Sequence, residues 1–498
     1  LFAKLTAFAT GSQRGKLRAV MKAFWDHLWR APEAYRLTSL VFLQGLGLIY
    51  VLAFASLAVQ IEGLAGSLGI LPLVEQQANL KAALGAERFI AFPSLFWICA
   101  SDAALVGAAW LGCAAGMLLT LGVWPRVMLI AAYALYLSLY HAGSVFMNFQ
   151  WDTLLLEAGF LSIFLVGGGA NIVIWLMRLL LFKLRFLSGV SKLISGDPAW
   201  SGLSALNVYF EVQPLPHPGA WYFHHLPDWL LKSATAGVLA IEILVPFLFL
   251  APRRYRMIGA ALTIALQVLI IASSNHNFIN LLTILLCLFL FDDQALRRFI
   301  PRFITTPPTQ IMTQAWRIAF AGFAAVIVAT SALQIGAMMA DTNLSGWLHT
   351  WERRVAAFAL SNRYHVFPIM KSERIEVVVE WSYDARTWTP LEFEYKPGDP
   401  KRAPKFIVPH HPRLDWHMWF VPLGPPQFVM PYQRFLARLQ QGSKPVLDLL
   451  PDGTFPNGPP RYLRAHLMRY AFTDPETRAR TGRWWTLEWR GPFLRSGA

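Results

Sequence analysis

Apolar residues fill long stretches in the first two thirds of the chain, and charged residues return after about residue 345. A helix needs about 20 mainly apolar residues to cross a bilayer, where lipid offers the backbone no hydrogen-bond partner. Strong candidate spans are 38–59, 95–121, 127–143, 230–250, 256–273 and 316–339, and weaker ones are 153–168, 171–187 and 277–291. The pattern predicts a multi-pass α-helical membrane protein.

From about residue 374 the spacing becomes that of β-strands. ERIEVVVEWSY and TWTPLEFEY predict a hairpin, and KFIVP (405–409) a third strand. Residues 431–450 predict a helix with Phe435, Leu436 and Leu439 on one face. RYLRAHLMRYAF and GRWWTLEWRGPF predict a further strand pair around ETRARTG. We expect a soluble β-rich (α+β) domain whose core contains Trp381, Trp388, Trp416 and Trp419.

These patterns divide the chain into a basic N-terminal segment (1–36), a transmembrane domain (37–340) and a soluble domain (345–498). Between two predicted spans, residues 188–228 form a long segment rich in Pro, Gly, Trp and His. A connection of this length in a compact protein is often functional. We interpret it as an external loop, either a cap or an ordinary packed loop.

The distribution of charged residues predicts how the chain is oriented in the membrane. Only 15% of the residues are charged, and the net charge is +15. The basic residues lie mostly between apolar stretches, which favours anionic lipid headgroups over nucleic acid as their partner. If all nine candidates cross, four basic loops share one side, which the positive-inside rule makes cytoplasmic. The C-terminal domain would then be extracytoplasmic. Segment 171–187 could instead lie flat on the membrane.

The three cysteines, Cys99, Cys113 and Cys287, all fall in predicted spans. The soluble domain must therefore hold its fold without disulfides. His410, His411, Asp415 and His417 cluster in HHPRLDWHM, but their spacing matches no standard metal site and Arg413 would repel a cation. We expect a packed, hydrogen-bonded corner there, no metal and no cofactor.

Ionisable residues inside apolar segments are the candidates for chemistry, because each is costly in a membrane unless it is paired. Glu157 and Glu242 lie within predicted spans, and Gln150 and Asp152 begin one. We interpret Asp152 as a helix cap and the two glutamates as partners of Arg178, Arg185 or Lys192. Asn277 belongs to a cluster with Asn275, His276 and Asn280 that favours a helix break. Further candidates flank or occupy the external loop: Lys192, Glu211, His224 and His225.

Several long motifs resemble the lipase maturation factor family over nearly the whole chain. They include NFQWDTLLLEAGFL, YFEVQPLPHPGAWYFHHLP, VPHHPRLDWHMWF and PPRYLRAHLMRYAFTDPETRARTGRWW. The resemblance implies a membrane-embedded factor that assists folding and assembly of lipases or other protein clients. Animal members are proteins of the endoplasmic reticulum membrane with a lumenal soluble region. The cysteine-free outer domain suggests a bacterial member, which would lie in the cytoplasmic membrane with that domain in the periplasm.

The membrane half is also similar, more weakly, to the transmembrane domain of vitamin K-dependent carboxylases. The similarity rests on Gly189-x-x-Lys192 in SGVSKL before a Trp-containing loop. It implies a second function, an enzyme that uses Lys192 as its base. A third alternative is a lipid-binding or transport protein. We expect the assembly factor and no enzyme activity, with membrane lipids as further partners.

Overall fold

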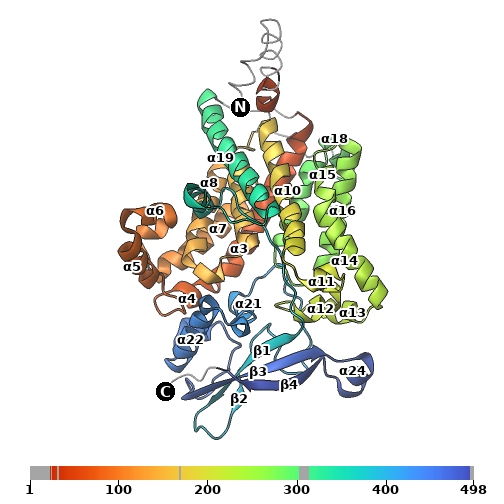
Figure 1. Ribbon diagram of the computed structural model, residues 1–498. Coiled ribbons are helices and arrows are strands. Elements are labelled where there is room, and N and C mark those ends of the chain that lie inside the picture. The colour runs from red at the N-terminus through yellow and green to blue at the C-terminus, as the bar shows by residue number, and fades with distance from the viewer. Residues whose placement is uncertain (1–22, 24, 31–32, 168–169, 302–312, 494–498) are drawn as a thin grey trace.

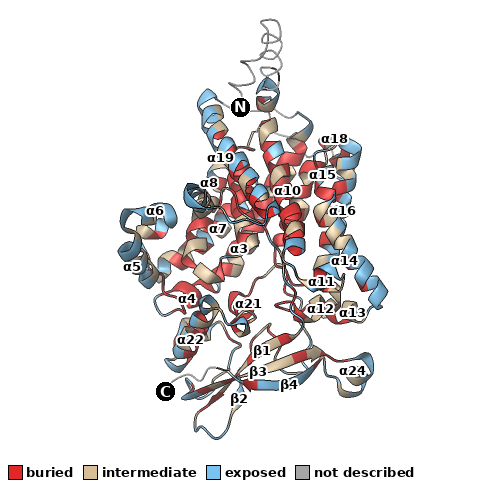
Figure 2. Cartoon of the chain, viewed as in Figure 1, coloured by how far each residue is buried: buried red, intermediate tan, exposed pale blue. Residues whose placement is uncertain are grey.

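The computed structural model describes residues 23, 25–30, 33–167, 170–301 and 313–493. A helical bundle carries a smaller domain with a β-sheet at one end, and the N-terminal residues lie at the opposite end (Figure 1). Buried residues gather in the middle of the bundle and between the bundle and the sheet, as Figure 2 shows. The predicted fold class is therefore confirmed.

Among the described residues, four helices are long and apolar enough to cross a membrane by length and composition: α3 (Arg36–Ala58), α7 (Asp102–Thr120), α16 (Arg253–Ser273) and α19 (Gln314–Met339). The other predicted spans are shorter or more polar helices, namely α8 (Pro125–Ala142), α9 (Gln150–Ile163), α14 (Asp228–Ile243) with α15 (Val245–Leu248), and α17 (Ile279–Leu286). The apolar residues of α9 and α17 face other helices, so apolar length alone overestimated the number of long spans.

Close packing of α3 on α7 depends on glycine. A Cβ atom added at Gly47 would lie 2.6 Å from the backbone nitrogen of Thr120, and one at Gly116 would lie 2.9 Å from the carbonyl oxygen of Gly47. Small residues let two helix backbones approach in this way, which is common between membrane helices. The apolar stretch LGLIYVLAFASLA thus contains the contact surface of the bundle as well as a candidate span.

Helix α10 (Asn171–Ile194) lies at the centre of the bundle (Figure 2). Arg178, Lys183 and Arg185 are all buried in it. A helix lying flat on a membrane would expose its basic face, so the interfacial alternative for 171–187 is wrong. The helix also runs seven residues past the predicted end of that segment, up to Ile194.

The predicted external loop is largely helical. It contains α11 (Pro198–Ser201), α12 (Ala205–Val212) and α13 (Pro218–His224). These short helices lie beside the sheet of the C-terminal domain (Figure 1). The segment therefore packs between the bundle and that domain.

Residues 61–101 form a lateral extension of the bundle with α4 (Ile61–Ala65), α5 (Leu73–Leu84) and α6 (Arg88–Ala91). The predicted span 95–121 is wrong in its first part, because α7 begins only at Asp102. Cys99 precedes that helix and is exposed, whereas Cys287 is buried. Two further helices, α18 (Asp293–Leu296) and α20 (Gly346–Ala357), precede and follow α19 in the sequence.

The C-terminal sheet is antiparallel with strand order β2-β1-β3-β4. Its strands are β1 (Arg374–Ser382), β2 (Thr389–Pro390), β3 (Tyr462–Phe472) and β4 (Trp485–Pro492). Both predicted strand pairs are confirmed, although β2 is only two residues long. α24 (Pro475–Thr481) joins β3 to β4; Asp474 caps its first turn, and Gly482 ends it with a positive φ of 70°.

Other predictions for this domain need correction. KFIVP forms no strand; instead its backbone is hydrogen-bonded by Asn275 of the bundle. The predicted helix 431–450 is two helices, α22 (Pro426–Gln440) and α23 (Lys444–Leu447), and the expected apolar face is buried. Trp381 lies in the domain core, but Trp416, on α21 (Arg413–Met418), packs with residues of the bundle. Trp388 and Trp419 are only half-buried.

Candidate functional site

The structure pairs Lys192 with Glu242. The Lys192 Nζ atom lies 2.8 Å from Glu242 Oε2, and Arg185 Nη2 donates to the other carboxylate oxygen at 2.6 Å. Arg185 and Lys192 lie seven residues apart on α10, which places them on one face two turns apart. The Glu242 partners foreseen from the sequence are therefore confirmed. Lys192 Nζ also donates to the carbonyl oxygen of Val366 at 2.7 Å.

Glu157 has a different partner from those expected. Its Oε1 atom lies 3.1 Å from Lys183 Nζ, in an ion pair whose side chains are 0% and 2% exposed. Its Oε2 atom accepts hydrogen bonds from the Asn362 backbone at 3.2 Å and from the Tyr364 hydroxyl at 2.9 Å. Lys183 Nζ donates in turn to Ser361 Oγ at 2.7 Å. Both oxygens of the Glu157 carboxylate are therefore paired with protein groups.

Gln150 completes a set of contacts to one short stretch of chain. Its Nε2 atom donates to the His365 carbonyl oxygen at 2.8 Å, and the His365 backbone N–H donates to Gln150 Oε1 at 3.0 Å. Residues 361–366, here called the junction segment, lead from the helical part to β1. Gln150, Glu157 and Lys192 were singled out separately in the sequence, and the structure brings all three to this segment.

Asp152 also holds the C-terminal domain. Its carboxylate accepts two hydrogen bonds from Arg413 of α21, at 2.7 and 2.8 Å, and one from the Tyr136 hydroxyl at 2.6 Å. The side chains of the ion pair are 0% and 2% exposed. Helix capping alone therefore does not explain Asp152. A buried pair of this kind is strongly destabilised when one partner is removed, because the other charge stays buried.

Glu211, His224 and His225 lie on the short helices beside the sheet. Glu211 Oε2 accepts the Phe472 backbone N–H at 2.8 Å. His224 Nε2 is 3.9 Å from the same carboxylate, which is too long for a hydrogen bond. Burial lowers the pKa of His224 to about 4, so the ring is neutral at pH 7. The His225 ring packs against the Trp221 ring, with centroids 4.3 Å apart, and its Nδ1 atom lies 2.7 Å from the Trp221 carbonyl oxygen.

Asn277 has a positive φ of 48°, and its Oδ1 atom accepts the backbone N–H of Ile279 at 3.0 Å. It therefore begins α17 after the break that follows α16, as the helix-break interpretation proposed. The neighbouring Asn275 donates to the carbonyl oxygen of Lys405 at 2.9 Å. This cluster, too, touches the C-terminal domain.

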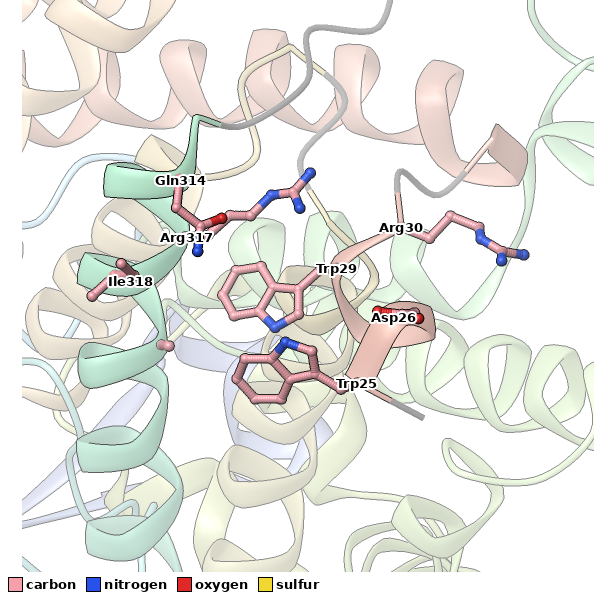
Figure 3. A pocket seen from close by; sticks show the side chains of 8 residues that line it. Trp25, Asp26, Trp29, Arg30, Gln314, Arg317 and Ile318 are labelled. Carbon is pink, nitrogen blue, oxygen red and sulfur yellow. The ribbon is translucent and has the colours of Figure 1, made fainter. Parts of the chain in front are cut away.

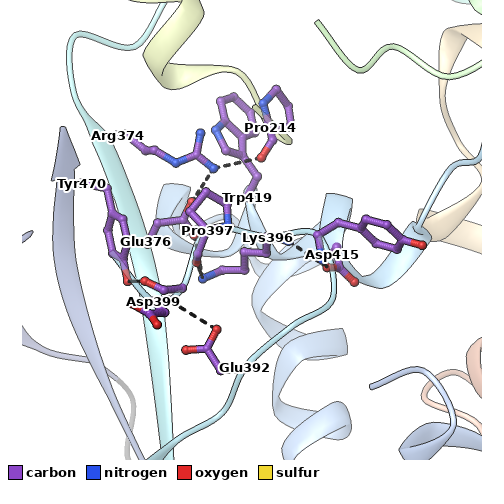
Figure 4. Close-up of polar contacts among 12 residues, drawn as sticks. Pro214, Arg374, Glu376, Glu392, Lys396, Pro397, Asp399, Asp415, Trp419 and Tyr470 are labelled. Atoms are coloured by element: carbon purple, nitrogen blue, oxygen red, sulfur yellow. Dashed lines mark hydrogen bonds and ion pairs between the residues drawn. The ribbon is translucent and has the colours of Figure 1, made fainter. Parts of the chain in front are cut away.

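Sequence analysis missed a buried charge cluster that Arg374 and Glu376 of β1 form with Lys396. Arg374 and Lys396 both pair with Glu376, at 2.5 and 2.8 Å, and Arg374 donates to the carbonyl oxygen of Pro214 at 2.9 Å (Figure 4). Strand alternation placed Glu376 on the face opposite Val377. That face is covered by the segment around Pro214, which no periodicity within the strand reveals.

The histidine-rich segment forms the packed corner that we expected. The His411 ring lies against Trp151 and Trp416, with ring centroids 4.8 and 5.1 Å apart. Asp415 accepts the backbone N–H groups of Tyr395 and Lys396 at 2.8 and 2.9 Å. Within the described residues, no group of three or more His, Cys, Asp or Glu side chains is placed to hold a metal ion.

Comparison with known proteins covers both parts of the chain. The lipase maturation factor transmembrane domain matches residues 37–298, and the lipase maturation factor C-terminal domain matches residues 360–495. No solved structure matches.

Full-length relatives agree with these matches. Lipase maturation factor 2 of Xenopus laevis is 33% identical, over 91% of this chain and 81% of that protein. The Homo sapiens protein of the same name is also 33% identical, over 93% and 82%. Lipase maturation factor 1 of Homo sapiens is 30% identical, over 92% and 87%. This chain is an integral membrane protein that belongs to the lipase maturation factor family.

Proposed function

We propose that the protein is a membrane-embedded folding and assembly factor for protein clients such as lipases. The proposal rests on the contacts that the buried polar residues of the bundle make with the C-terminal part of the chain. Gln150, Glu157 and Lys192 bind the junction segment, and Asp152 binds Arg413. These contacts hold the C-terminal domain in one position on the bundle. A fixed domain at the membrane surface suits a factor that presents a binding face to clients.

The C-terminal domain offers a face of this kind. β4 is an outer strand of the sheet, and residues 486–490 are exposed. Trp489 is 62% exposed and Leu487 is 38% exposed. An extended client segment can add to an open sheet edge through backbone hydrogen bonds, with side-chain contacts supplying selectivity. The neighbouring charges Glu488 and Arg490 would limit self-association of this edge.

The enzyme alternative requires a Lys192 amine that loses its proton and reaches a substrate. Lys192 Nζ lies within hydrogen-bond reach of Glu242 and of the carbonyl oxygens of Ser188 and Val366, and these three acceptors occupy the three N–H donors of the ammonium group. They therefore support a structural cation more than a general base.

For localisation, we propose that the end of the bundle carrying Arg126, Arg253 and Arg254 faces the cytoplasm. The C-terminal domain would then be extracytoplasmic, in the periplasm of a bacterium or the lumen of the endoplasmic reticulum. The argument is the positive-inside rule.

The test is co-expression of the full chain with a secreted lipase in cells that lack a factor of this family. We expect more active lipase per unit of lipase protein than in cells without the chain. Trp489→Ser should reduce this gain while the melting temperature stays unchanged; Trp229→Ser, at another exposed tryptophan, should not. An unchanged lipase activity with and without well-expressed chain would overturn the proposal.

A further inference from the structure

A pocket of about 390 Å³ opens at the end of the bundle opposite the C-terminal domain. One wall is a helical segment bearing Trp25, Asp26, Trp29 and Arg30, and the other is the first two turns of α19 with Arg317 and Ile318 (Figure 3). The two indole rings lie 5.5 Å apart between centroids. The wall therefore combines aromatic, charged and aliphatic side chains.

Polar groups at this pocket lack protein partners. Trp29 is only 7% exposed, yet its Nε1 atom forms no hydrogen bond within the described residues, and the same holds for the buried Nε atom of Arg317. Buried donors of this kind are almost always paired, with protein, water or ligand. Among the described residues, Asp26, Arg30 and Arg317 form no ion pair either. The pocket thus presents two cations, one anion and unsatisfied N–H donors.

The position of the pocket indicates where its ligand comes from. α19 has 26 residues. At about 1.5 Å per residue it is longer than the roughly 30 Å hydrocarbon core, so its first turns reach the headgroup layer. Tryptophan is enriched at that depth, and arginine there pairs with lipid phosphate. Arg126 is nearby, with its guanidinium 5.6 Å from the Trp316 ring centroid.

We propose that this pocket binds the headgroup of a glycerophospholipid. Arg317, beside the Trp29 ring in Figure 3, holds the phosphodiester, because a guanidinium group forms strong charge-assisted hydrogen bonds to phosphate oxygens; Arg30 points away from Arg317 and adds positive charge at the rim of the pocket. The Trp29 indole N–H donates to a further headgroup oxygen, and one acyl chain lies along Ile318. Asp26 suits the ammonium group of an ethanolamine headgroup, so an amine-bearing lipid is preferred over an anionic one.

Native mass spectrometry of the delipidated full-length protein in detergent tests the site, with titrations of phosphatidylethanolamine and phosphatidylglycerol. Arg317→Gln should weaken phosphatidylethanolamine binding about tenfold, as loss of a hydrogen bond to a charged group does. Asp26→Asn should remove the preference for phosphatidylethanolamine over phosphatidylglycerol. The matched control is Arg254→Gln, an exposed arginine at the start of α16. Melting curves verify that each variant is folded.

The results separate lipid from other sources. Equal affinities of the Arg317→Gln and Arg254→Gln variants would contradict the site, because general annular binding would then explain the lipid. Inorganic phosphate that competes at millimolar concentration would overturn the lipid assignment in favour of a free-phosphate site. Failure of phosphate to compete, together with the tenfold loss in Arg317→Gln, is the result that we expect.

Discussion

Lys192 Nζ lies 2.8 Å from Glu242 Oε2 in a pair whose side chains are 4% and 6% exposed. Arg185 shares the same carboxylate, and Lys192 reaches the junction segment through the Val366 carbonyl oxygen. Lys192, the base in the enzyme alternative, therefore connects α10 with α14 and with the start of the C-terminal domain.

Lys192→Met should lower stability by about 2 kcal/mol, because it removes charge-assisted hydrogen bonds to buried acceptors while Glu242 keeps Arg185. Lys192→Arg keeps the charge and should cost less. Detergent melting curves measure both, with Lys444→Met as a control at an exposed lysine that is also paired with an aspartate. An inactive but fully stable Lys192→Arg would instead favour the enzyme alternative.

Trp416→Ala should destabilise the full-length protein by about 3–5 kcal/mol, the usual cost of truncating a large buried aromatic side chain. Trp416 is 2% exposed and packs on Trp151 of the bundle. The effect should be much smaller in the isolated C-terminal domain, since the partner ring is then missing. The exposed Trp489→Ala is the control, expected within about 0.5 kcal/mol of the unchanged protein. Equal losses for the two variants would contradict the assigned contact.

The Asp415 carboxyl predicts a pH dependence. Burial raises its pKa from 3.8 to about 6. The contribution of this carboxyl to the free energy of unfolding is therefore fully present below pH 3.8, and it is lost as the pH rises through about 6, because the buried group must then ionise. The difference is about 3 kcal/mol. Asp415→Asn keeps the Oδ1 acceptor for the Tyr395 and Lys396 N–H groups and removes the titration.

We therefore expect the Asp415→Asn variant to be the more stable of the two proteins at pH 7.5, with the gain disappearing towards pH 4. Melting temperatures of both proteins across this range check the prediction. The comparison is made between the two proteins because other groups titrate as well. Burial lowers the pKa of His410 and of His417 to about 4, which destabilises both proteins in acid. Lower stability of the variant at pH 7.5 would show that the ionised carboxylate is needed.

Thiol labelling tests the orientation of the bundle. Cys99 is exposed just before α7, and the first residue of α7, Asp102, accepts a hydrogen bond from Ser67, whose neighbour Leu68 is hydrogen-bonded by Ser443 of the C-terminal domain. A membrane-impermeant maleimide added to intact cells should label Cys99 and not the buried Cys287. The Cys99→Ser variant should remain unlabelled. Labelling of Cys99 only after permeabilisation would place the C-terminal domain on the cytoplasmic side.

The sequence predicted the elements better than the contacts between them. Strand alternation located β1 and β3, and the apolar stretches located α3 and α19, because these signals are local. The partners of Glu157 and Asp152 were not predictable, because Lys183, Ser361 and Arg413 come from separate segments that only the tertiary fold brings together. KFIVP was mistaken for a strand because its composition is typical of strands. Its backbone is instead hydrogen-bonded by the side chain of Asn275, which lies far away in the sequence.

The central claim is that buried polar groups of the bundle fix the position of the C-terminal domain. A double-mutant cycle on Asp152 and Arg413 tests it most directly. The variants are Asp152→Asn, Arg413→Gln and the double change. An exposed pair that also joins the two parts, Glu75 and Arg434, serves as control through Glu75→Gln and Arg434→Gln.

Each single change at the buried pair should cost about 3–5 kcal/mol, because an unpaired charge stays buried, and the double change should cost less than their sum. The exposed pair should show a coupling of at most about 1 kcal/mol. Limited proteolysis should also cut the single variants near the junction segment faster than the unchanged protein. Additive costs at Asp152 and Arg413, with unchanged proteolysis, would contradict the claim.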